Sequence, residues 1–102
     1  MHEKLLELSR ELKEKFKDEI IEIIVFGSYA RGDLDEDSDI DILVVVNDDS
    51  VEDDLRKAAY SFIPKIGRLI SVKIIDKKTF ENMKKMEFSL ISSIEKEGIK
   101  IG

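Results

Sequence analysis

The sequence contains no cysteine, no tryptophan, and only one proline and one histidine. Without cysteine, the chain can form neither a disulfide framework nor a thiolate metal site. No apolar run approaches the roughly 20 residues needed to cross a bilayer, and the charged first residues do not resemble a signal peptide. We therefore expect a cytoplasmic protein that makes no use of a membrane.

Positive charge is also scarce. The chain has 17 lysines and arginines against 23 aspartates and glutamates, a formal net charge of −6. Affinity for long nucleic acids comes from Lys and Arg displacing counterions from phosphates, so this balance argues against direct binding of a long nucleic acid. A small anionic nucleotide, such as a nucleoside triphosphate, can still bind if metal ions offset the repulsion.

The length of 102 residues predicts one small domain over residues 1–102. The hydrophobic fraction of 42% is ordinary for a folded domain, whereas the charged fraction of 39% is high. A chain of this size has room for one active site. We expect that site to be completed by a partner or by a second copy of the chain, so a homo-oligomer is one expectation.

Hydrophobic periodicity predicts the order of the elements. Apolar residues at helical spacing predict an amphipathic helix over residues 3–17, and β-branched residues predict a strand over 20–26 that ends in a turn. The remaining expectations are strands over 39–46 and 68–75, a helix over about 51–66 capped by Ser50, a helical region from 77 to Gly98 capped by Asp76, and an edge strand or tail over 99–101. The order predicts an α/β or α+β fold, a small mixed sheet of three to four strands with helices packed on one side.

A glycine-serine turn follows the first predicted strand. Gly27 marks a place where the backbone comes close to a ligand or takes a conformation that other residues resist. Ser28 offers a hydroxyl and begins a short helical turn whose free N–H groups favour an anion. The turn is suited to a triphosphate, although strand-to-helix turns also use these residues for purely structural reasons.

Two aspartates, Asp39 and Asp41, occupy alternate positions of the second predicted strand. Side chains alternate between the faces of a strand, so these two carboxylates project the same way. Together they can bind Mg²⁺ or Mn²⁺, which prefer oxygen ligands and retain substrate phosphates in their coordination shell. The alternative is that both acids lie near the solvated start of the strand and have no ligand.

The two segments together are more specific than either alone. The run Gly27-Ser28-Tyr29-Ala30-Arg31-Gly32, followed by Asp39-Ile40-Asp41, resembles the signature of minimal nucleotidyltransferases in the DNA polymerase beta-like superfamily. The resemblance covers nearly the whole chain. It includes Phe26 before the glycine, Ser38 before the first aspartate, and an ending over residues 93–99 that looks like the closing helix of the family.

This resemblance implies a metal-dependent transfer of a nucleoside monophosphate with loss of pyrophosphate. It implies that Ser28 and the Gly27 backbone contact the β,γ-phosphates, that Asp39 and Asp41 bind the metals, and that ATP is the substrate. Arg31 has two interpretations. It can bind phosphate, or it can form a structural ion pair with the neighbouring acids of the 33–37 loop.

The chain departs from the family pattern on the next strand. Superfamily members usually carry a third carboxylate there, and Lys73 occupies the matching position. Asp76, the nearest acid, has the opposite strand parity and is better suited to cap a helix. Lys73 can place its ammonium where a metal would lie and pair with Asp39 or Asp41, or it can be a surface lysine whose stem covers apolar neighbours.

Two functions follow from the resemblance. Small proteins that resemble this chain are typically antitoxins encoded beside HEPN-domain toxins, which they neutralise by adenylylation. The first hypothesis is therefore a protein adenylyltransferase that acts on a HEPN-type toxin. The alternative, suggested by Lys73, is a catalytically weak or inactive nucleotide-binding module that neutralises or regulates its partner by binding alone. The preferred nucleotide, the acceptor and the oligomeric state cannot be read from the sequence.

Overall fold

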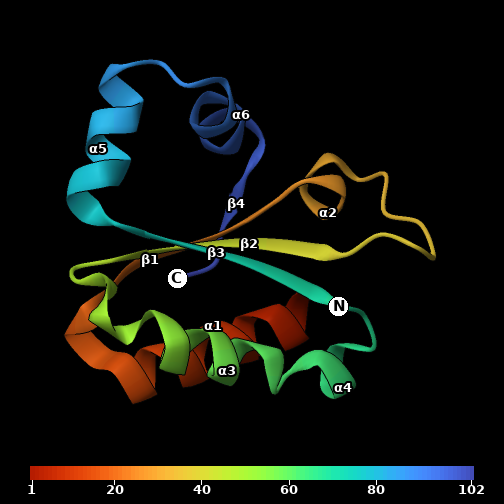
Figure 1. Cartoon of the computed structure of the whole chain (residues 1–102). Helices are drawn as coiled ribbons and strands as arrows, with labels where there is room; N and C mark the ends of the chain where they lie inside the picture. Colours follow the sequence, from red (N-terminus) through yellow and green to blue (C-terminus); the bar gives the residue numbers. More distant parts are fainter.

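The computed structural model describes residues 1–102 and contains a four-stranded sheet with helices on both sides (Figure 1). The elements in chain order are α1 (His2–Phe16), η1 (Lys17–Glu19), β1 (Ile20–Phe26), α2 (Ser28–Arg31), β2 (Ile40–Val46), η2 (Asp49–Val51), α3 (Glu52–Tyr60), α4 (Ile63–Ile66), β3 (Ile70–Asp76), α5 (Lys77–Lys85), α6 (Ser89–Glu97) and β4 (Ile99–Lys100). None of the helices is long and apolar enough to span a membrane.

The sheet is mixed, with strand order β3-β2-β1-β4. β2 runs antiparallel to β1 and parallel to β3, and β4 pairs antiparallel with the other edge of β1. The predicted segment 99–101 therefore contributes an edge strand, over Ile99–Lys100, one of the two outcomes that the sequence allowed. In the β1–β2 register Phe26 lies opposite Asp41, so the end of β1 and the start of β2 meet at one edge of the sheet.

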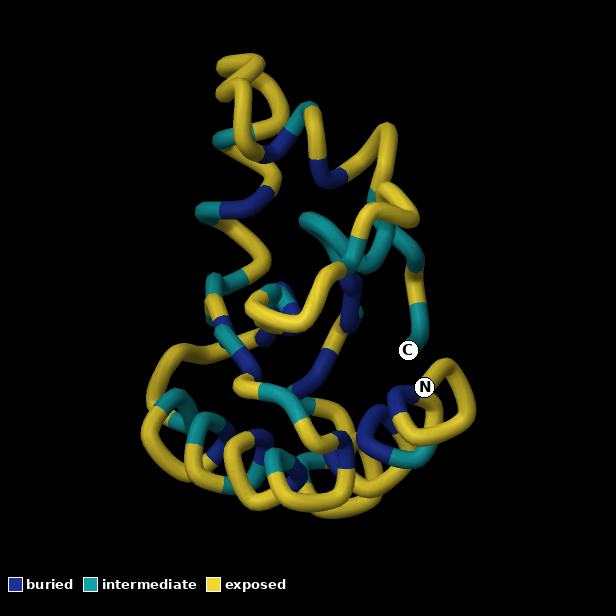
Figure 2. Tube along the Cα trace, turned by 90° about the vertical axis from the view of Figure 1, so that its right-hand side faces the viewer, coloured by how far each residue is buried: buried dark blue, intermediate teal, exposed yellow.

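Two separate cores cover the two faces of the sheet. The larger contains 16 buried residues and packs α1, α3 and α4 against one face, and the smaller contains 6 and packs α5 and α6 against the other. Buried segments of the chain lie along the sheet and on the inner faces of the helices (Figure 2). The prediction of a small mixed sheet is confirmed. The expectation that the helices pack on one side is wrong. Both faces of β2 carry buried apolar residues, so each face needs a layer of helices to cover it.

The local predictions differ in outcome. β1 has the predicted bounds, and Asp76 caps α5 by accepting hydrogen bonds from the Thr79 amide at 2.7 Å and the Thr79 hydroxyl at 2.9 Å. The helix predicted over 51–66 is divided into η2, α3 and α4. Ser50 is not its N-cap: the Ser50 amide donates to Asp48 Oδ1 at 2.9 Å, and Asp48 precedes η2.

Gly98 directly follows α6. Glycines at this position commonly adopt a left-handed conformation that ends the helix, but Gly98 does not. Its φ of −68° is accessible to any residue, so a left-handed conformation is not required. A Cβ there would lie 2.3 Å from the Ile94 carbonyl oxygen and 2.6 Å from Ile24 Cγ2. The glycine lets the chain pass close to β1 as it enters β4.

Candidate functional site

The turn after β1 brings Gly27 into direct contact with β2. Gly27 has φ +72° and ψ −148°, a region that is essentially restricted to glycine. A Cβ at this position would lie 2.2 Å from Asp41 Oδ2 and 3.1 Å from Asp41 Cγ. The glycine therefore meets two requirements: a backbone conformation that L side chains rarely adopt, and space for the Asp41 carboxylate.

Replacing Gly27 with alanine tests this contact. We expect Gly27→Ala to lower the free energy of unfolding by about 3 kcal/mol, because backbone strain and displacement of Asp41 add together. Gly32→Ala is the control, since Gly32 has φ +79° but a Cβ added there would meet no heavy atom within 4 Å. It carries strain alone and should cost about 1 kcal/mol. Urea unfolding measures both.

A double-mutant cycle separates collision from strain at Gly27. In an Asp41→Ala background the carboxylate is absent, so Gly27→Ala should lower the free energy of unfolding by less than it does in the wild type. Fully additive losses would show that the two residues do not interact, contrary to the 2.2 Å approach.

A cleft of about 320 Å³ opens beside this contact, between the end of β1, α2, β2 and α6. It contains four of the five residues predicted for the site. Its lining residues are Phe26, Gly27, Ser28, Arg31, Asp41, Leu90, Ser93, Ile94 and Glu97. The fifth predicted residue, Asp39, does not line the cleft: it is exposed and immediately precedes β2.

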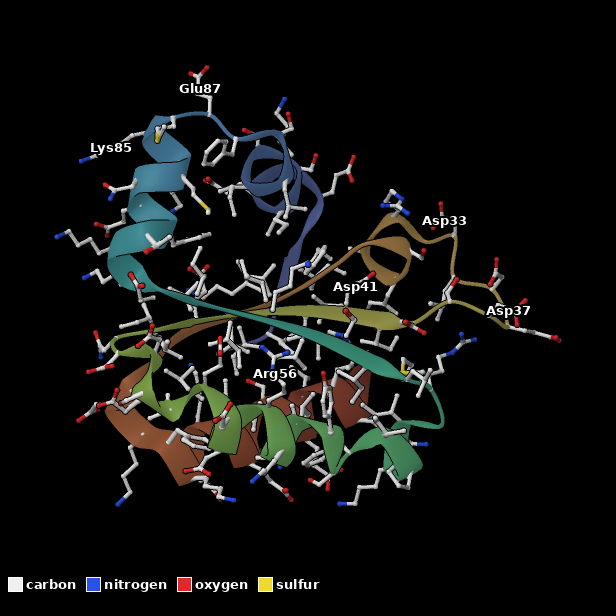
Figure 3. All side chains as sticks on the ribbon, in the orientation of Figure 1. Asp33, Asp37, Asp41, Arg56, Lys85 and Glu87 are labelled. Atoms are coloured by element: carbon white, nitrogen blue, oxygen red, sulfur yellow. The ribbon has the colours of Figure 1, made fainter.

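Asp41 lies in an unfavourable environment for a carboxylate. Partial burial raises its pKa, and the neighbouring Asp39 raises that pKa further, while Lys73 and Arg31 oppose the shift. Figure 3 shows Asp41 on β2 beside α2, with Asp33 and Asp37 on the loop beyond. A bound cation would reduce the repulsion between the like charges of Asp39 and Asp41.

Arg31 forms the ion pair that the sequence allowed. Its Nε lies 3.5 Å from Asp33 Oδ2, and one terminal nitrogen lies 3.5 Å from the Ser28 hydroxyl oxygen. The pair is exposed, so its contribution to stability is small. Because Arg31 also lines the cleft, the ion pair leaves its guanidinium at the candidate site.

The loop that leads to Asp39 is held by Arg68, a residue that the sequence analysis did not single out. Arg68 Nη1 donates to the Ser38 carbonyl oxygen at 3.0 Å and also to the Asp35 carbonyl oxygen. Asp35 Oδ1 accepts from the Asp37 amide at 2.9 Å and from the Ser38 hydroxyl at 3.0 Å, and these bonds lower the pKa of Asp35. No spacing in the sequence links Arg68 to a loop 30 residues away.

Lys73 lies on the same face of the sheet as Asp41. In the parallel β2–β3 register Asp41 is opposite Ser71 and Leu43 is opposite Lys73, so the lysine is two positions further along that face. It is exposed, and its charge favours the ionised form of Asp41. Nowhere in the chain are three or more histidine, aspartate or glutamate side chains grouped to hold a metal ion.

The opposite wall of the cleft was not predicted from the sequence. Leu90, Ser93, Ile94 and Glu97 recur at i, i+3, i+4 and i+7, which places them on one face of α6. The apolar members of this row predict a helix, but the pattern gives no sign that α6 lines the same cleft as the glycine-serine turn.

Comparison with known proteins assigns the family. The sequence profile of the family described as "Nucleotidyltransferase domain" matches residues 5–101. One protein of Methanocaldococcus jannaschii, named "Putative protein adenylyltransferase", is 35% identical over 98 residues, covering 93% of this chain and 92% of that protein. A second protein of the same name and organism is 40% identical over 89 residues, covering 85% and 83%.

Solved structures share the fold. One is a toxin–antitoxin complex with AMP-PNP, with a TM-score of 0.62 and 19% identity over 95% of this chain and 72% of that chain. Another is a tri-AMPylated HEPN toxin of Shewanella oneidensis in complex with an MNT antitoxin, with a TM-score of 0.58 and 17% identity over 100% and 72%. The resemblance carried by the glycine-serine and aspartate segments is confirmed: the chain belongs to the nucleotidyltransferase domain family.

Proposed function

We propose that this chain transfers AMP from ATP to a HEPN-domain protein and acts as the antitoxin of a toxin–antitoxin pair. The observation that carries the proposal is the cleft in which Gly27, Ser28 and Arg31 meet Asp41. The names of the M. jannaschii relatives and the toxin–antitoxin complexes among the structural neighbours support the acceptor class.

The residues of the cleft suit the two ends of the reaction. The Gly27 backbone, the Ser28 hydroxyl and the Arg31 guanidinium would hold the β,γ-phosphates. Asp39 and Asp41 fit a Mg²⁺ or Mn²⁺ ion, because such an ion takes one or two carboxylates and completes its shell with substrate phosphates. When bound, the ion neutralises charge on the transferring phosphoryl group.

The transfer itself is an in-line displacement. The acceptor hydroxyl oxygen forms a bond to the α-phosphorus while the bond from that phosphorus to the pyrophosphate oxygen breaks, and the hydroxyl proton passes to solvent or to a neighbouring base. The role of this chain is to hold the phosphates in line with the acceptor. We propose that residues 1–102 act as one domain in this reaction, with the partner supplying the acceptor.

The direct test is an incubation with labelled ATP, Mg²⁺ or Mn²⁺, and the HEPN-domain protein encoded beside this chain. We expect that protein to gain the mass of one or more AMP groups, as measured by intact-mass spectrometry. If the HEPN protein forms a complex with this chain and loses its toxicity without any gain in mass, adenylyl transfer is not the mechanism.

Lys73 favours the second candidate function, a module that binds nucleotide and neutralises its partner without transfer. Its ammonium lies on the same face as Asp41, in the position where the resemblance expects a third acid. Neutralisation that persists when both Asp39 and Asp41 are replaced would favour this function. Neutralisation that disappears with them would favour the enzyme.

Arg68 is expected to position Asp39 for metal binding. Asp39 is exposed, and Arg68 holds the carbonyl of the residue before it, while the Ile40 amide after it donates to the Leu69 carbonyl oxygen at 2.9 Å. We expect Arg68→Met to weaken Mn²⁺ binding in the presence of ATP by about tenfold, the effect typical of losing a group that orients a metal ligand. A Mn²⁺ titration followed by electron paramagnetic resonance measures the change.

Arg56→Met is the matched control. Arg56 also donates to a backbone carbonyl, that of Val72 at 2.6 Å, but it lies between α3 and the sheet, on the face away from Asp41 (Figure 3). We expect this variant to bind Mn²⁺ as the wild type does. Equal losses in both variants would mean that general destabilisation, and not the loop, accounts for the effect.

A further inference from the structure

The cleft has two chemically different walls. On one side Ser28 and Arg31 belong to α2, and Gly27 and Asp41 lie at the sheet edge. On the other side α6 presents its own row of residues, and Figure 1 shows α2 and α6 over the same face of the sheet. If the first wall holds the phosphates, as the proposed function requires, the second is left for the rest of the nucleotide.

Charge supports this division. Arg31 is the one cationic residue that lines the cleft, and it lies on the α2 wall. The α6 wall carries Glu97, whose ionised carboxylate repels phosphates and can only accept hydrogen bonds. A triphosphate placed along α6 would face an uncompensated negative charge. The nucleoside has no such conflict.

The α6 wall also has the composition of a base site. Leu90 is 50% exposed, and Ile94, one turn further along the same face of the helix, is buried and also lines the cleft. Ligand sites are typically apolar surfaces with a few polar groups that fix orientation. Glu97 lies one turn beyond Ile94, so a base that rests on Leu90 and Ile94 has its edge within reach of the Glu97 carboxylate.

We propose that Glu97 selects the base of the nucleotide: its carboxylate accepts a hydrogen bond from the exocyclic amino group of adenine, and Leu90 and Ile94 contact the ring. The inference rests on the proposed function, because it takes the phosphate wall as given. It adds the substrate specificity that sequence alone left open. ATP is favoured over ITP, in which an oxo group replaces the amino group and would face the carboxylate.

The test compares the dissociation constants of ATP, ITP, dATP and tripolyphosphate, measured by calorimetry with Mg²⁺ on the intact chain. We expect the wild type to bind ATP about tenfold more tightly than ITP, the effect of one hydrogen bond to a charged group in an open cleft. In Glu97→Gln the ratio should fall to near one, because an amide can accept from adenine and donate to hypoxanthine. Affinity for tripolyphosphate, which has no base, should be unchanged or stronger.

Glu95→Gln is the matched control. Glu95 lies on α6, two residues before Glu97, and does not line this cleft. Its Oε2 lies 4.0 Å from Nζ of Lys84, a residue of α5. The Glu95→Gln variant removes the same charge from the same helix and should keep the wild-type preference for ATP. A preference that falls equally in both variants would overturn the proposal, since it would then reflect charge alone.

The remaining outcomes are also decisive. Equal wild-type affinities for ATP and ITP would overturn the role of Glu97 while leaving the nucleotide site intact. A preference for ATP over dATP that is lost in Glu97→Gln would assign the carboxylate to the sugar hydroxyls and overturn its contact with the base. If neither ATP nor tripolyphosphate binds, the proposed function itself fails.

Discussion

The double variant Asp39→Asn, Asp41→Asn is expected to transfer AMP at least about a thousandfold more slowly than the wild type, because the loss of metal stabilisation amounts to several kcal/mol. The fold should survive the change. Burial and the charge of Asp39 raise the pKa of Asp41, so the ionised form of this carboxylate is disfavoured in the folded chain. Neutral amides of the same shape remove that repulsion, and the melting temperature should be equal or higher.

The measurement is the initial rate of AMP transfer to the HEPN-domain partner, together with thermal unfolding of each variant. Glu36→Gln, Asp37→Asn is the control, because it removes the same two charges from the exposed loop before β2. This control should keep most of the wild-type rate. Rates that fall equally in both double variants would mean that overall charge matters more than the two carboxylates beside the cleft.

The variant Lys73→Asp is expected to raise the rate of AMP transfer by at least about tenfold, since a further carboxylate joins Asp41 on its face of the sheet and a tenfold gain needs only about 1.4 kcal/mol. Stability gives a second measurement. Lys73 favours the ionised form of Asp41, so its replacement by an acid concentrates negative charge. We expect a lower melting temperature in EDTA, restored by Mn²⁺ to a greater extent than in the wild type.

Lys73→Met separates the new ligand from the lost ammonium. It removes the positive charge and keeps an apolar stem, but supplies no oxygen. If the methionine and aspartate variants gain activity equally, the lysine is simply inhibitory. If neither variant differs from the wild type, position 73 is not the position of the third acid, and the alignment of β3 with the family pattern is wrong.

The parts of the fold that the sequence predicted are those with local causes. The bounds of β1 follow from a run of β-branched residues that ends at a glycine, and the Asp76 cap follows from a carboxylate placed three residues before the Thr79 amide. The division into α3 and α4 was not predicted. It falls at residues 61–62, directly before Pro64 in the first turn of α4, whose ring and missing N–H disfavour an unbroken helix.

The candidate site shows the same division. The sequence assigned Gly27 and Asp41 to one site, and the β1–β2 register brings the two residues together. Arg68 and Glu97 lie 30 and 56 residues from Ser38 and Asp41 in the chain, and only tertiary packing brings them to the loop and the cleft. A single sequence contains no signal for contacts of that separation.

The unequal cores on the two faces of the sheet have a consequence for motion. The α5–α6 layer rests on a cluster of 6 buried residues, whereas α1, α3 and α4 share one of 16. Local opening requires less free energy where fewer apolar side chains must be exposed, so amide hydrogens of α6 should exchange with solvent sooner than those of α1. Of the two helical layers, the one that carries Glu97 is therefore expected to open with the smaller cost in free energy.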